Sequence, residues 1–224
     1  MKQLTAATVT VALSLALVGC GSDHKSGDKT STSTSTSTST STSTPATSTA
    51  PAAGAKYTIA DYVKDHLIAE TPVHRGDPGS PTINLPLPPG WKVSDNVNTS
   101  YGGIVLEQPA NPSDPPVIAA LVSSVTGDVD PAKLIQFAPG ELQNLPGFQG
   151  SDGTASTLGG YQAWQLNGTY QKDGTTRVVA QKTVVIPAQG GVFVLQLNAN
   201  APQSDQGPLM DATNIIDDQT TIGS

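Results

Sequence analysis

Three histidines and the acidic residues near them are the side chains of this sequence that could bind a metal ion. His24 lies in a polar N-terminal stretch, whereas His66, His74 and Asp77 are close enough in sequence to share a site. Their spacings of eight and three residues cross a segment rich in proline and glycine and match no usual zinc motif. We therefore expect a helix histidine and a loop histidine, with no metal and no cofactor.

A serine nucleophile would need a base within hydrogen-bonding reach and a sharp turn that exposes its hydroxyl. Ser151 is the candidate, but Gln149 stands where the nucleophile elbow requires a glycine. Ser151 would also have to recruit His66 or His74 from a distant part of the chain. We predict no catalytic residues and a protein that is not an enzyme.

Two tryptophans are candidates for a ligand groove, because an indole offers a large apolar face and one N–H donor to an acyl chain or a sugar. Trp91 follows a Pro-Pro-Gly turn, and Trp164 lies beside Ala163 in a strand pattern. The alternative for each is a place in the hydrophobic core, which the strand pattern favours for Trp164. We carry Trp91 and Trp164 forward as candidate groove residues.

The composition excludes several function classes. Eleven Lys and Arg stand against eighteen Asp and Glu, and the net charge of −7 supplies no basic face for nucleic acid. A single cysteine excludes an intramolecular disulfide framework and a thiolate metal cluster.

That cysteine, Cys20, stands at the end of a predicted export signal. Lys2 precedes an apolar stretch over 6–18 that is too short to cross a bilayer. The sequence Leu17-Val18-Gly19-Cys20 resembles the bacterial lipobox, which predicts cleavage between Gly19 and Cys20 and S-diacylglyceryl and N-acyl groups, such as palmitate, on Cys20. Two acyl chains hold a protein stably on a membrane. An ordinary secretory signal with an incidental cysteine is the alternative.

Residues 20–55 are predicted to form a lipidated N-terminus and a solvated tether. Thr and Ser alternate strictly over 30–44, so neither face of a strand would have a reason to be buried. The Ser, Thr and Pro content is also typical of O-glycosylated segments, with a bare spacer as the alternative.

Residues 56–224 are predicted to form one globular domain, with eight basic and sixteen acidic side chains. Thr58 is a typical helix N-cap with Asp61 at the N3 position. The expected apolar stripe of this first helix runs through Ile59, Tyr62, Val63, His66 and Leu67. Strands are expected at 82–85, 101–107, 117–124, 148–158, 161–171, 175–187 and 191–199.

Two further helices are expected. Asp130 and Pro131 are an N-cap and an N1 proline, and that helix is interrupted at Pro139 and ends near Asn144. A last helix spans 205–218, with a stripe of Leu209, Ala212, Thr213 and Ile216. Asp217 and Asp218 close this helix where its dipole disfavours them, and the sequence gives no reason for their presence.

Two of the expected strands are apolar on both faces, at 117–122 and at the start of 191–199. Such strands need cover on both sides. The sequence therefore predicts an α+β fold, an α/β/α sandwich with a largely antiparallel sheet flanked by helices.

Several segments resemble a known family. Pro89-Gly90-Trp91 after a first strand is similar to the entry of the Mog1/PsbP-like fold. Over the whole chain the sequence resembles the LpqN/LpqT family of mycobacterial lipoproteins, on the segments 57–62, 70–73, 76–81, 101–104, 130–133, 145–148, 163–166 and 179–182.

The resemblance implies a lipoprotein of the cell envelope, exported and held at the cell membrane with its domain facing the periplasm. It implies a non-enzymatic binding or carrier module for mycolate glycolipids of the trehalose-ester type, working with membrane lipid transporters. The alternative is a protein-interaction module, or a shed virulence effector that binds host proteins. The family has no established catalytic motif, so no active-site residue is carried over.

Overall fold

The computed structural model describes residues 54–97, 99 and 101–223. Its helices are α1 (Ile59–Asp65), α2 (Pro131–Phe137), α3 (Gly140–Gln143), η1 (Gln203–Asp205) and α4 (Gln206–Gln219). Its strands are β1 (Ala69–Pro72), β2 (Thr82–Asn84), β3 (Trp91–Val93), β4 (Gly102–Leu106), β5 (Val117–Thr126), β6 (Gln149–Gly150), β7 (Thr154–Leu158), β8 (Tyr161–Lys172), β9 (Thr175–Ala188), β10 (Gly191–Pro202) and β11 (Thr221–Gly223). Among the described residues no helix is long and apolar enough to cross a membrane.

The first helix begins where its capping residues predict and ends earlier than its apolar stripe suggested. Thr58 and Asp61 form a capping box, each side chain accepting a hydrogen bond from the other's backbone N–H. The helix stops at Asp65, because His66 is the C-cap and Leu67 turns to a φ of +53°. The prediction that His66 and Leu67 lie on the buried stripe is therefore wrong.

The other helices follow the sequence signals closely. The Asp130 carboxylate accepts a hydrogen bond from the backbone N–H of Ala132, at 2.9 Å, and α2 begins with Pro131 at its first turn. The chain breaks at Pro139 before the short α3. In α4 the buried side chains are Leu209, Ala212 and Ile216, as the stripe predicted.

Nine strands form one sheet in the order β3-β4-β5-β10-β9-β8-β6, with β1 paired to β5 and β7 to β8, and every pair is antiparallel. The strand predicted over 148–158 is divided into β6 and β7. Gly153 has a φ of +90°, which bends the chain between these two strands. A Cβ atom at position 153 would lie 2.3 Å from the Trp164 indole nitrogen. The sequence patterns did not predict β1, β3 or β11.

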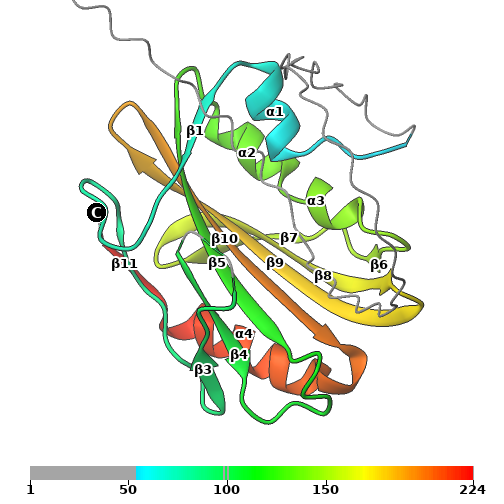
Figure 1. Cartoon of the computed structure of the whole chain (residues 1–224). Helices are drawn as coiled ribbons and strands as arrows, with labels where there is room; N and C mark the ends of the chain where they lie inside the picture. Colours follow the sequence, from blue (N-terminus) through cyan, green and yellow to red (C-terminus); the bar gives the residue numbers. More distant parts are fainter. Residues whose placement is uncertain (1–53, 98, 100, 224) are drawn as a thin grey trace, which may run out of the picture. The chain divides into compact units, whose positions relative to one another are not determined.

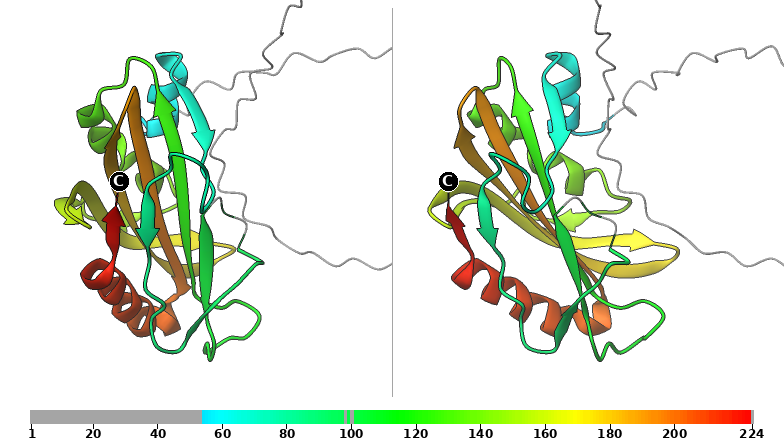
Figure 2. Two further views of the ribbon diagram at one scale, coloured as in Figure 1. Left: turned by 90° about the vertical axis from the view of Figure 1, so that its left-hand side faces the viewer. Right: turned by 60° about the vertical axis from the view of Figure 1, so that its left-hand side comes forward.

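Both faces of the sheet are covered. Leu195 and Leu197 of β10 pack with Leu209 of α4, whereas Val192 and Val194 pack with the residues of α1 and α2. Figures 1 and 2 show α1, α2 and α3 gathered together, α4 apart from them and a strongly twisted sheet. The predicted α+β sandwich is confirmed. The helix α4 covers one face of the sheet, and α1 and α2 cover the other.

Candidate ligand-binding groove

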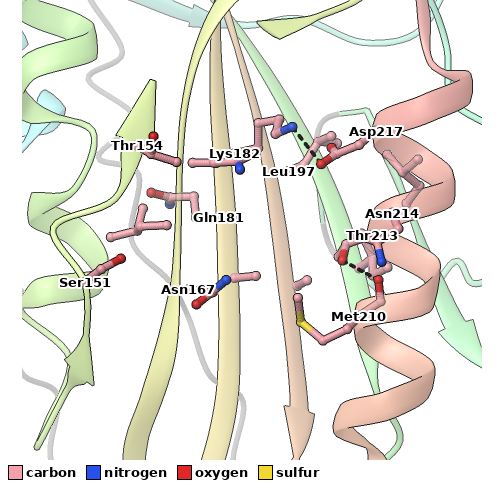
Figure 3. A pocket seen from close by; sticks show the side chains of 16 residues that line it. Ser151, Thr154, Asn167, Gln181, Lys182, Leu197, Met210, Thr213, Asn214 and Asp217 are labelled. Carbon is pink, nitrogen blue, oxygen red and sulfur yellow. Dashed lines mark hydrogen bonds and ion pairs between the residues drawn. The ribbon is translucent and has the colours of Figure 1, made fainter. Parts of the chain in front are cut away.

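A groove runs between α4 and the face of the sheet that α4 covers. Its first part, the polar arm, is a cavity of about 230 Å³ over β8, β9 and β10. Strand residues such as Asn167 and Lys182 form one side, and Met210, Thr213 and Asn214 of α4 form the other (Figure 3). Amide, hydroxyl and charged groups thus face a cavity that also has apolar walls.

One ion pair joins the two sides of the polar arm. The Lys182 ammonium on β9 lies 2.7 Å from an Asp217 carboxylate oxygen on α4 (Figure 3). The Lys182 side chain is 8% exposed, so this charge is almost fully removed from water and depends on Asp217 for its partner. This ion pair gives a reason for Asp217 at the end of α4, which the sequence alone did not explain.

The second part of the groove, the apolar arm, is a cavity of about 250 Å³. It lies between the β2–β3 loop and strands β4 and β5. Leu85, Leu87, Val93 and Ile104 line it, with Arg75 as the charged side chain in its lining.

The two arms meet at a common wall. Ile118, Leu197 and Ile216 line both cavities, so the polar and apolar arms lie side by side, and we call the pair the α4 groove. At about 230 and 250 Å³, each arm is somewhat smaller than the roughly 300 Å³ at which ligand pockets usually begin. The α4 groove therefore places a polar and an apolar cavity side by side, which is the two-sided chemistry that an amphiphile needs for its polar group and its apolar chain.

The opposite face of the sheet carries a buried polar cluster under α3. The Glu141 carboxylate accepts hydrogen bonds from the side-chain amides of Gln181, at 3.1 Å, and Gln196, at 3.2 Å. Burial raises the pKa of Glu141, the two amide bonds oppose the rise, and nearby Glu70 adds to it. Burial also raises the pKa of Glu70. Acceptor atoms of Gln181, Thr183 and Gln196 have no hydrogen-bond partner among the described residues.

The two candidate tryptophans do not come together in one groove. Trp91 is 4% exposed and packs in the hydrophobic cluster on the α4 face. Trp164 packs on the other face with Val185, and its indole N–H donates to the Asp152 carbonyl at 3.1 Å. Neither lines the α4 groove. The expectation that each lines a ligand groove is corrected, because the two side chains pack in hydrophobic clusters on opposite faces of the sheet.

The residues weighed for metal binding and catalysis are also separated. Asp77 accepts a hydrogen bond from the backbone N–H of His74, at 2.7 Å, in an exposed turn, whereas His66 caps α1 and stacks near Tyr62. No group of three metal-ligating His, Cys, Asp or Glu side chains occurs within the described part of the chain. Ser151 does line the polar arm, but its hydroxyl accepts from the Gly153 N–H and the arm's lining contains no histidine.

Sequence reasoning missed most of the groove. Lys182 and Asp217 are 35 positions apart, and only the packing of α4 on β9 joins them. A signal existed in each case, because Lys182 interrupts the apolar run of its strand and Asp217 opposes the dipole of its helix. Cys20, the predicted lipid-attachment residue, lies outside the described residues.

These features define the class of protein: an antiparallel α/β/α sandwich with a two-part groove beneath one helix. A family model described as "Probable lipoprotein LpqN" matches residues 55–223. The chain therefore belongs to the LpqN lipoprotein family, as its sequence segments suggested.

Individual relatives agree with the family match. The chain is 65% identical to lipoprotein LpqN of Mycobacterium tuberculosis (strain ATCC 25618 / H37Rv) over 173 residues, 76% of each chain. It is 26% identical to lipoprotein LpqT of Mycobacterium leprae over 106 residues, 47% of each chain. A solved structure, "Crystal structure of LpqN involved in cell envelope biogenesis of Mycobacterium tuberculosis", matches with a TM-score of 0.74 and 63% identity, covering 76% of this chain and all of that one. The chain in that solved structure therefore corresponds to this domain alone.

Proposed function

We propose that this protein is an exported envelope lipoprotein whose domain binds and carries an amphiphilic glycolipid of the trehalose-ester type. In this proposal it is not an enzyme. It is an accessory to glycolipid transport or envelope assembly, receiving the lipid from membrane transporters and passing it onward. The relatives' description as lipoproteins, one of them involved in cell envelope biogenesis, supports the compartment and the process.

The observation that carries the proposal is the division of the α4 groove into two arms. The amide and hydroxyl groups of Asn167, Thr213 and Asn214 suit the hydroxyls of a sugar. The Lys182–Asp217 pair is internally neutralised, so the polar arm favours an uncharged head group over a phosphate. The apolar arm then receives part of an acyl chain, and the remainder would extend out of the groove.

The predicted anchor makes weak binding sufficient. Acylation at Cys20 would keep the domain at the membrane, and the tether of thirty-five residues (21–55) would have a root-mean-square span of roughly 30 Å. A tethered carrier meets the membrane at high effective concentration, so it does not need a tight affinity for each lipid.

Native mass spectrometry of residues 54–224 after exposure to a panel of envelope lipids tests the proposal. We expect trehalose esters to remain bound as one-to-one complexes, with fewer complexes for phospholipids of the same chain length. Unliganded protein across the whole panel would contradict the proposal.

A protein-interaction role is the second candidate, and one residue favours it. Leu67 is 93% exposed, lies beyond the end of α1 and is not among the residues that line either arm of the groove. An exposed apolar side chain can anchor a partner protein, in the envelope or in a host. Crosslinking in living cells through a photoreactive amino acid at position 67 should recover a defined partner, and background proteins alone would count against this role.

A further inference from the structure

Two of the most exposed apolar side chains of the domain stand at the apolar arm. Within the described residues, the large hydrophobic side chains that are exposed are Tyr57, Leu67, Leu87 and Val93. Leu87 is 53% exposed and Val93 is 68% exposed, and both also line the apolar arm. They come from different segments, the β2–β3 loop and the edge strand β3, so the cavity brings them to a common rim.

The loop that presents Leu87 is held firmly. Leu87 lies between Pro86 and Pro88, whose rings fix their backbone φ angles. The Pro88 side chain is fully buried, and its carbonyl accepts a hydrogen bond from the Trp91 N–H at 3.1 Å. Exposure of Leu87 is therefore built into the loop, and the loop backbone loses little entropy when a partner covers it.

The charge at this rim differs from that of the domain. Residues 56–224 carry twice as many acidic as basic side chains, yet no carboxylate is among the residues that line the apolar arm. The charged side chain there is Arg75, which is exposed and whose guanidinium lies 4.7 Å from the centre of the Tyr101 ring. An apolar rim with one cation and no anion complements an anionic lipid surface.

We propose that the rim of the apolar arm, formed by Leu87, Val93 and Arg75, docks on a lipid bilayer. Leu87 and Val93 enter the boundary between head groups and acyl chains, and Arg75 contacts a lipid phosphate. The apolar arm then opens directly onto the acyl layer, so a lipid chain moves between bilayer and groove without crossing water. This inference rests on the proposed function for the content of the groove, and the docking itself can be tested separately.

Vesicle sedimentation tests the docking with residues 54–224, which lack the predicted lipid anchor. The vesicles contain equal parts of phosphatidylcholine and phosphatidylglycerol, or phosphatidylcholine alone. We expect wild-type protein to bind the mixed vesicles and the double variant Leu87→Ser/Val93→Ser to bind them at least about ten-fold more weakly. Arg75→Gln should lose about five-fold on mixed vesicles and little on neutral ones.

Leu67→Ser is the matched control, because it removes an even more exposed leucine that does not line the groove. It should bind like wild type, and circular dichroism should show every variant folded. Equal binding by wild type and the double variant, or no binding by wild type, would overturn the inference.

The same proteins separate this inference from the proposed function. Wild-type protein that binds a short-chain trehalose ester in solution but no vesicles would overturn the docking and leave the carrier proposal standing. Vesicle binding that depends on the rim, without any binding of the ester, would support the docking and contradict the carrier proposal.

Discussion

Leu67 occupies a backbone position that is usually filled by glycine. Its φ is +53°, and the N–H of the next residue, Ile68, bonds the Val63 carbonyl at 3.0 Å, which is the Schellman pattern at a helix C-terminus. A leucine in the left-handed region costs roughly 1–2 kcal/mol relative to an unstrained conformation. Its side chain is 93% exposed, so packing in the domain does not offset that cost.

Replacing Leu67 by glycine should therefore stabilise the domain by about 1 kcal/mol. Urea unfolding followed by circular dichroism measures the change. Leu67→Ala is the control, because it removes the side chain and keeps the Cβ that causes the strain. An equal gain for glycine and alanine would show that exposure of the side chain, and not the backbone, matters.

Glu141 makes the stability of the domain depend on pH. Its pKa in the fold lies above the ordinary value of 4.5, so the fold favours the protonated form. The resulting stabilisation is fully present below about pH 4.5 and is lost as the pH rises through the raised pKa. Glu70, whose pKa is raised by burial, acts in the same direction.

We expect the Tm difference between wild type and Glu141→Gln to change in favour of the variant as the pH rises from 4.5 to 7.5. A glutamine at position 141 can pair with the unpartnered amide oxygens of Gln181 and Gln196 and carries no charge. Calorimetry across this pH range measures the difference, with Glu107→Gln, at an exposed glutamate, as the control. A Tm difference that stays constant with pH would contradict a raised pKa at Glu141.

Among the elements, α4 forms one wall of the groove and is held to the rest of the domain at several points. Leu209 and Ile216 bury into the sheet, and the chain after the helix pairs with β2 through β11. The Lys182–Asp217 pair adds a polar fastening between β9 and α4. The width of the polar arm thus depends on the packing of a helix and on one ion pair.

Breaking that ion pair should have an asymmetric effect. Asp217→Asn leaves the nearly buried Lys182 without its counter-charge and should destabilise the domain by about 2 kcal/mol. Lys182→Met leaves a partly exposed carboxylate that water can solvate, so it should cost less. Denaturant unfolding compares the two, with Asp218→Asn as a neighbouring exposed control. A larger loss of stability for Lys182→Met than for Asp217→Asn would contradict the inference that the buried Lys182 depends on Asp217.

Elements formed by interactions between residues close in sequence could be predicted, whereas elements formed by contacts between distant residues could not. The capping residues Thr58 and Asp130 and the stripe of α4 act within a few residues, and the sequence located α1, α2 and α4 from them. β1 and β11 have four and three residues and owe their form to distant partners, so no local pattern marked them. The groove escaped prediction for the same reason, since Ile118, Leu197 and Ile216 meet only in the folded domain.

At the scale of the whole molecule, the predicted anchor at Cys20 determines where the groove works. A diacylglyceryl cysteine holds the protein at a membrane. Without it, the chain would either be cleaved and leave the membrane or remain as the uncleaved precursor. The Cys20→Ser protein should therefore lose incorporation of labelled palmitate, and any cleaved form of it should move from the detergent phase to the aqueous phase in detergent phase separation. Labelling that persists without Cys20 would contradict the assignment of the acylated residue.

In the proposed function, the α4 groove is the binding site for a glycolipid. Asn214 of α4 is exposed and lines the polar arm, and Asn214→Trp should fill that arm. Gln219→Trp is the matched control, an exposed amide on the same helix that does not line the groove. The decisive measurement is the dissociation constant of a trehalose ester for these variants and wild type. We predict that Asn214→Trp binds at least about ten-fold more weakly while Gln219→Trp binds like wild type, and equal binding by all three proteins would contradict the account.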